Sequence, residues 1–464
     1  MRIRLVLLCL GLVTGLATPL PAGAVEISEC RVSTSPGIGV SSGVSLGFPQ
    51  PIERLAAKAN PRILVVPFRL SDTPKAKFTN EIKESYLKAK RTISNLSNGQ
   101  NQVEFIFNAM IDTTFTRADL IKLKRDTLYV SKRDETKSTP GFVRNFIETY
   151  DKILDLRDID AVYLQGPPPS PEELSLPGDM NIAEAFQFFE NPKDQLFRPV
   201  ITNEGKIYNF VLHTGDVGNA DTIIHEIMHM YGLVDFYRGE NFPIGLSMMS
   251  SYYFSRLLNY ERWVLGWVKD NQVQCLIEGK QIKEDVVSTR IKIPTKPIDQ
   301  MVIIRTSAAT SAFIAEISSD IPPNSPKSRM FYFYLLQNEG ESGPVSMAGP
   351  VPPGLDGILI SNEKNWLYSE IGSYLKIDKY ALLISDIDDQ EITLDLILTT
   401  KLDEAQPLIK IAKDLGERRM LELRNRQRLL VSKSIKCVNG KISKVIKGPT
   451  PKCPKGFRPA PKKR

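Results

Sequence analysis

Histidine is scarce in this chain. Its 464 residues contain three, His213, His225 and His229, and all lie within seventeen positions. Any metal site that needs imidazole ligands must therefore be built in this one segment. Beyond the N-terminus no apolar run is long enough to span a bilayer, which excludes a later transmembrane helix. The sequence also lacks a recognisable nucleic-acid-binding motif and a long-period repeat, so we expect no nucleic-acid partner.

The N-terminal 24 residues have the pattern of a secretory signal peptide. Arg2 and Arg4 form a basic start, an apolar stretch follows, and a small-residue cleavage site ends at Ala24. The alternative is a membrane anchor, for which the apolar stretch is short. We therefore predict cleavage after Ala24 and a secreted protein, free or held at the cell surface, with no transmembrane segment after cleavage.

Cysteine is also sparse, with five residues, one of them inside the signal. The four that remain are Cys30, Cys275, Cys437 and Cys453, and an even number in an exported chain favours disulfides. Cys437 and Cys453 flank a short turn-rich stretch, so we expect them to pair. Cys30 then pairs with Cys275 by elimination. The alternative is a second zinc site, although every histidine lies elsewhere.

Acidic residues are absent from the tail, residues 431–464, which contains eleven Lys or Arg. The whole chain has a net charge of +7, so the rest of it is net negative. A basic tail on an exported protein is suited to binding an anionic cell-envelope polymer or membrane. The alternative is a solvated, flexible chain end.

The three histidines belong to an extended motif. His225 and Glu226 open an H-E-x-x-H run that ends at His229, and Gly232 and Asp235 follow at spacings of three. On a helix, positions i and i+4 share one face, so both imidazoles can reach one metal ion. Glu226 is placed to act on a metal-bound water without coordinating. A turn at the glycine would bring in the aspartate as third ligand, leaving an open position on zinc.

The alternative for the motif is a chance match on an ordinary helix. Its flanks argue against this, because residues 219–221 suit a helix start and an apolar stripe lies along the helix. His213 is a candidate substrate-side group or alternative ligand, but we favour a strand-end histidine with neither role. Trp263 and Trp267 are expected in the core, and Glu261 and Arg262 as a solvated or structural pair.

The rest of the chain divides into two parts that differ in their pattern of predicted strands and helices. Up to residue 275, predicted strands alternate with predicted helices, which indicates a mixed twisted sheet. The last of these strands, 206–212, is expected at a sheet edge, where it can bind a substrate backbone by strand addition. After residue 275, short alternating runs indicate a β-sandwich or similar module, followed by a charged helical stretch. Before residue 275 we expect strands at 62–68, 103–111, 161–164 and 206–212, and helices at 78–96 and 139–156; after it, strands at 290–293, 301–304, 331–336 and 392–398, and a helix at 402–430.

We thus predict an α+β protein in six parts. They are a signal peptide (1–24), an N-terminal extension looping over the catalytic domain (25–60), a catalytic domain with the zinc helix (61–275), a β-rich, sandwich-like domain (276–400), a helical connector (401–430) and the basic disulfide tail (431–464).

Three stretches together resemble the immune inhibitor A-like family of secreted bacterial zinc metallopeptidases. They are residues 225–237, 246–251 and 259–268. The resemblance covers residues 60–275 and, more weakly, the chain to about 400. It implies a metzincin-like fold and an aspartate as third zinc ligand.

Carried over residue by residue, the resemblance implies His225, His229 and Asp235 as Zn2+ ligands. It implies Glu226 as general base and Met249 as the methionine of the turn beneath the metal. The chain departs from the family pattern at Met228, Val234 and Arg238, and none of these departures removes a ligand or the base.

The sequence therefore predicts a zinc endopeptidase that acts on protein or peptide substrates. Zinc would polarise the scissile carbonyl and activate water, while Glu226 takes the proton and later passes it to the leaving amine. The alternative is a non-catalytic cell-surface binding protein on a metallopeptidase scaffold. Intact ligands and an intact base favour the enzyme.

Overall fold

The structure is a computed structural model. It describes residues 26–33, 46–50, 52–73, 77–129, 139–167, 182–187, 198–214, 219–234, 247–249, 256–295, 299–309, 311–317, 331–337, 346–347, 371–388, 390–431, 434–440, 442–447 and 451–460. The predicted signal peptide and Asp235 lie outside these ranges.

The N-terminal half is built on a mixed sheet with strand order β2-β1-β4-β8-β5, and β3 also pairs with β1. Neighbours pair in parallel except β5, which is antiparallel to β8. The sheet is buried on both faces, which explains the continuous apolar run of β1. The strands are β1 Arg62–Arg69, β2 Glu104–Phe107, β3 Ile111–Asp112, β4 Ala161–Gln165, β5 Ile182–Gln187 and β8 Asn209–Thr214.

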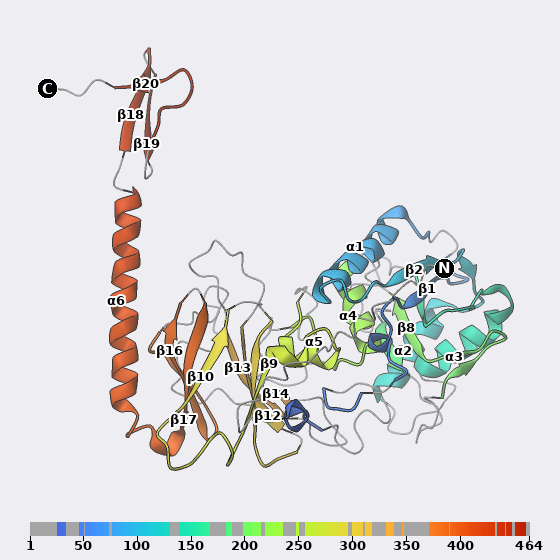
Figure 1. Cartoon of the computed structure of the whole chain (residues 1–464). Coiled ribbons are helices and arrows are strands. Elements are labelled where there is room, and N and C mark those ends of the chain that lie inside the picture. The colour runs from blue at the N-terminus through green and yellow to red at the C-terminus, as the bar shows by residue number, and fades with distance from the viewer. Residues whose placement is uncertain are drawn as a thin grey trace, which may run out of the picture.

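Alternate residues of these strands supply two separate cores. Val65, Tyr163 and Val211 pack with α1 and α4, whereas Val66 and Leu164 pack on the other face with α2 and α3. Figure 1 shows these two helix layers on either side of the sheet. The helices are α1 Asn80–Leu96, α2 Arg117–Tyr129, α3 Thr139–Tyr150 and α4 Ala220–Met230.

The predicted edge strand at 206–212 is wrong in both extent and position. Lys206–Ile207 is a separate strand, β7, paired with β6 at Val200–Ile201. The main strand, β8, begins at Asn209 and lies between β4 and β5. Sequence patterns locate strands but not their order, so the error is one of topology. Within the described part of the chain, β5 is the end strand beside β8.

Two further sheets pack face to face as a sandwich around one core. Val302, Ile304 and Phe313 of one sheet meet Leu382 and Leu394 of the other. The first has the order β14-β13-β12-β11-β9 and the second β10-β17-β16-β15. The strands are β9 Val273–Ile277, β10 Thr289–Pro294, β11 Met301–Arg305, β12 Ser311–Ile317, β13 Phe331–Gln337, β14 Ser346–Met347, β15 Tyr374–Ile377, β16 Tyr380–Ile387 and β17 Glu391–Leu398.

The sandwich and the first sheet share a core. Met301 and Ile303, which alternate with the sandwich-facing residues of β11, pack in the cluster that also contains α4. The predicted boundary at residue 275 falls inside β9. The described part of the N-terminal extension is also buried there, through Val32 and Leu55. The division into domains stays a prediction.

Both expected disulfides are present. Cys30 bonds to Cys275 across a sequence separation of 245, and Cys437 bonds to Cys453 across 16. The first ties the N-terminal extension to β9. The second lies in the tail, which forms a small sheet of order β19-β18-β20. Its strands are β18 Ser434–Asn439, β19 Ile442–Lys447 and β20 Arg458–Pro459.

A long helix, α6 at Gln406–Val431, leads from the sandwich to the tail (Figure 1). Ile409 and Ala412 pack its first turns on Ala381 and Leu383 of β16. Among the described residues, no helix combines the length and apolarity that a bilayer span requires.

Candidate metal centre

The helix that carries the motif, α4, is fixed at both ends by its own sequence. The side chain of Asn219 caps its start by accepting from the Asp221 amide at 3.0 Å. At the other end the Gly232 amide donates to the His229 carbonyl at 2.9 Å, and the Leu233 amide donates to the Met228 carbonyl at 3.0 Å. This pair of bonds is a Schellman motif, and Gly232 supplies its positive φ of 104°.

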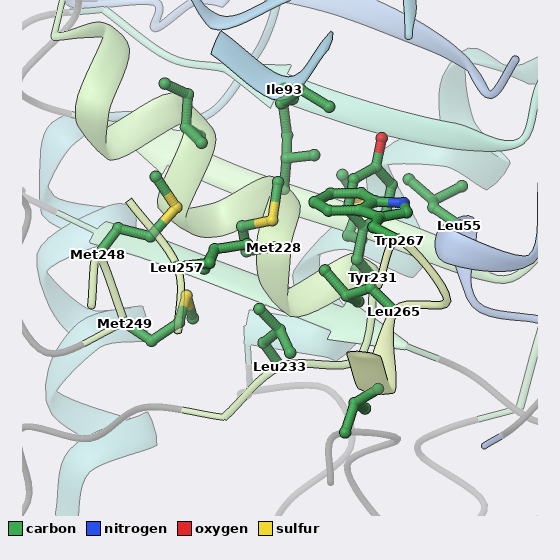
Figure 2. Packing of buried hydrophobic residues seen from close by; sticks show 14 of the residues in the cluster. Leu55, Ile93, Met228, Tyr231, Leu233, Met248, Met249, Leu257, Leu265 and Trp267 are labelled. Carbon is green, nitrogen blue, oxygen red and sulfur yellow. The ribbon is translucent and has the colours of Figure 1, made fainter. Parts of the chain in front are cut away.

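Hydrophobic packing completes this turn. Met228 and Leu233 are both fully buried, and a contact between these two positions commonly accompanies a Schellman motif. Figure 2 shows the Met228 side chain directed toward Ile93 of α1, with Leu233 on the opposite side of the end of α4. Met228 thus belongs to the buried cluster at the end of α4.

The two motif histidines face one another. Their ring centroids lie 4.8 Å apart, as expected for i and i+4 on one helix face. The Nδ1 atom of His225 lies 2.9 Å from the Met248 carbonyl oxygen, and that of His229 lies 2.8 Å from the Leu233 carbonyl oxygen. A carbonyl only accepts, so Nδ1 carries the proton in both rings and Nε2 is left available as an acceptor.

Glu226 is buried, with 1% of its surface exposed, and faces the sheet. Burial raises the pKa of Tyr163 well above its usual value, and the charges of Tyr86 and Glu226 raise it further. Glu226 therefore lies near enough to β4 to act on that phenol electrostatically. The hydroxyl of Tyr163 is in turn 2.8 Å from Nδ1 of His213.

His213 lies near the C-terminal end of β8, as expected of a strand-end histidine, on a strand that has neighbours on both sides. It is fully buried on β8, between Gln165 of β4 and Ala183 of β5. Its hydrogen bond to Tyr163 gives the imidazole a structural partner. Its lack of a ligand role stays a prediction.

The third predicted ligand, Asp235, lies outside the described residues, which break off at Val234 just after the turn. Across the described ranges, no group of three or more His, Cys, Asp or Glu side chains gathers as a metal site would require. The structure therefore brings together two of the three predicted ligands, and the third stays a prediction.

Residues 247–249 form the turn in which Met249 was predicted. Met248 and Met249 are buried, and Figure 2 shows their side chains with Leu257 beside the end of α4. The Met248 amide donates to the Arg256 carbonyl at 2.8 Å, which holds the turn to the chain that returns to α5. Met249 is packed as expected of a residue with no chemical role.

The helix α5, Asn259–Val264, corrects one expectation and confirms another. Glu261 and Arg262 do not pair with each other: Arg262 pairs with Asp299, with Nη2 and Oδ2 at 3.1 Å. Glu261 is fully buried, accepting from the Ser247 hydroxyl at 2.9 Å and the Leu258 amide at 2.6 Å. Burial raises its pKa to about 8 despite these two bonds. Trp263 and Trp267 lie in the core, as expected.

Comparisons with known proteins give little. The chain matches no known family and none of the curated proteins. Among solved structures it is similar to metalloproteinase-II from Bacteroides fragilis, at a TM-score of 0.27 and 12% identity. The alignment covers 53% of this chain and 62% of that chain, so this chain spans less than two thirds of that protein. A TM-score this low does not establish a shared fold.

Proposed function

We propose that the protein is a secreted zinc-dependent endopeptidase. His225, His229 and Asp235 hold the metal ion, and Glu226 is the general base. One observation carries the proposal: two imidazoles on one helix face, each with Nδ1 donating to a backbone carbonyl. That arrangement fixes both rings and is characteristic of metal-ligating histidines.

The proposed donors fit zinc. Neutral imidazole nitrogens and a carboxylate are ordinary zinc ligands, and three of them leave one coordination position open. Bound there, zinc would supply a Lewis acid that polarises a peptide carbonyl and lowers the pKa of water. Gly232 turns the chain back immediately after His229, which suits delivery of Asp235 from the following segment.

Glu226 moves the proton. It follows His225 directly on α4 and is 1% exposed, so its carboxylate is buried beside the first proposed ligand. It takes the proton from the attacking water and returns it to the leaving amine. A substrate backbone would add to β5, which contacts α4 and ends the strand order beside β8.

The tail is proposed as an attachment module for an anionic cell-envelope polymer. Exposed basic side chains of its described part are Lys436, Lys444, Lys452, Lys455 and Arg458. Its sheet stands at the far end of α6 from the proposed metal centre (Figure 1), so attachment through the tail would not cover that centre.

The assignment of roles is tested by substitution. Glu226→Gln should keep zinc and lose turnover by about two to four orders of magnitude, because the base is removed and no ligand is. Asp235→Ala should weaken zinc binding itself. His213→Ala is the matched control, since it removes the third histidine without removing a proposed ligand. Zinc loss in His213→Ala with zinc retained in Asp235→Ala would overturn the ligand set.

A further inference from the structure

We propose that Glu261 is a positioning residue for the metal centre, acting through Ser247 and the Met248 carbonyl on the imidazole of His225. The inference rests on the proposed function, because it concerns a ligand of the proposed metal. Glu261 lies 36 positions beyond His225 in the sequence.

The contacts form a continuous buried chain. The Ser247 hydroxyl donates to Glu261 Oε1 at 2.9 Å, and the Met249 amide donates to Ser247 Oγ at 3.1 Å. The peptide unit that joins Met248 to Met249 is therefore anchored on its amide side by Ser247. The carbonyl of the same peptide unit accepts from His225 Nδ1 at 2.9 Å. Displacing Ser247 thus tilts the group that orients the imidazole.

Glu261 also closes the loop that carries this turn. Its second oxygen, Oε2, accepts from the Leu258 amide at 2.6 Å, so one carboxyl bridges the two ends of residues 247–258. The Met248 amide and Arg256 carbonyl form the bond next to it. The same bond makes Glu261 the acid at the third position that caps the start of α5, and this carboxyl is fully buried.

The support behind Glu261 is itself rigid. The backbone of α5 is held to the sandwich, because the Tyr260 amide donates to Glu316 Oε2 of β12 at 3.1 Å. Arg262 pairs with Asp299 on the approach to β11. Two separate contacts thus hold the helix that carries Glu261, so removing one of them leaves the other in place. Glu316, also buried, is a second glutamate that holds α5, through the Tyr260 amide.

Four variants distinguish a role of Glu261 in orienting His225 from a general contribution to folding stability. Glu261→Ala removes both bonds of the carboxyl, and Ser247→Ala removes only the middle of the chain. Glu261→Gln is the conservative rescue, because it keeps the size of the side chain and one acceptor oxygen for the Leu258 amide, while its NH2 group can donate to Ser247 Oγ. Glu316→Ala is the matched control, since it deletes a neighbouring buried glutamate that holds α5.

The measured quantity is the 15N NMR signal of the His225 imidazole. The chain has three histidines, so selective 15N labelling gives three pairs of ring signals, assignable by His→Gln substitution. We expect the His225 Nδ1–H signal to shift or lose its protection in Glu261→Ala and Ser247→Ala, and to recover in Glu261→Gln. Zinc affinity should fall about tenfold in the first two variants, the low end for loss of an orienting partner. Glu316→Ala should lower stability but leave His225 unchanged.

Unchanged His225 signals in folded Ser247→Ala and Glu261→Ala would overturn the positioning role. So would an equal shift in Glu316→Ala, which would mark a general loss of packing. The ring signals are measured without metal, so they test this inference even if the wild type binds no zinc. Failure of the wild type to bind zinc would instead refute the proposed function.

Discussion

The turn that ends α4 offers a sharp test, because Gly232 stands between two proposed ligands. Its φ of 104° is disfavoured for any residue with a Cβ atom. A Cβ added there would lie 3.2 Å from Cδ and from Nη1 of Arg54. Arg54 cannot easily yield, since it is 7% exposed and its Nη2 donates to the Val264 carbonyl at 2.7 Å.

Gly266 is a matched control for Gly232→Ala. It ends α5 in the same motif, with its amide donating to the Trp263 carbonyl and the Trp267 amide donating to the Arg262 carbonyl. Its φ is 80°, and an added Cβ would have nothing within 4 Å. Gly266→Ala therefore reports backbone strain alone, about 1–2 kcal/mol. Gly232→Ala adds a steric contact, for a total of about 2–4 kcal/mol.

Denaturant unfolding followed by tryptophan fluorescence measures both, because Trp263 and Trp267 lie in the same core as α4. Zinc retention is measured in parallel. Gly232→Ala should be the less stable variant and should lose zinc, whereas Gly266→Ala should keep it. Equal stability of the two variants would refute the contact with Arg54, and full zinc retention in Gly232→Ala would refute the role of the turn in presenting the third ligand.

Three further predictions concern other parts of the molecule. A chain that ends at residue 430 should hydrolyse peptides normally but bind envelope fragments less well at low salt; equal binding across a salt series would leave the tail as a solvated end. Replacing Cys30 and Cys275 by Ser should lower the free energy of unfolding by about 5 kcal/mol, because this disulfide closes a loop across a sequence separation of 245. Replacing Cys437 and Cys453, which are separated by 16, should leave the melting temperature of the rest of the protein unchanged. Glu261 binds its proton more tightly folded than unfolded, with a pKa raised from 4.5 to about 8, so its stabilising effect is complete below pH 4.5 and is lost as pH rises through about 8. At about 1.4 kcal/mol per pKa unit, the free energy of unfolding should fall by on the order of 5 kcal/mol across this pH range. Glu261→Gln should flatten this pH dependence of stability. A variant whose stability depends on pH as the wild type's does would refute the raised pKa of Glu261.

Local patterns predicted those elements whose periodicity is strong. The apolar run at residues 62–68 is β1, the helical spacing at 78–96 is α1, and the 402–430 stretch is α6. The helix α2 was not predicted, because charged residues interrupt its apolar pattern. Its buried face is also narrow: among its described side chains, the buried apolar ones are Leu120 and Leu123.

What the sequence could not predict depends on contacts between distant segments. The interior place of β8 follows from its pairing with β5, which no local pattern shows. From the sequence, Glu261 and Arg262 were expected to form a solvated or structural pair. The residue that donates to Glu261, Ser247, lies fourteen positions earlier, and no local pattern links the two. The sequence did contain one signal for this contact. It has a serine directly before two methionines, and further on an acid at the third position of a short helix.

The most direct test of the central claim is the metal content of the purified mature protein, measured together with peptide hydrolysis before and after chelation. The proposed set of three ligands with an open position predicts about one zinc per chain and hydrolysis that stops on chelation and returns with zinc. Full hydrolysis of a broad peptide library after complete metal removal would contradict the account.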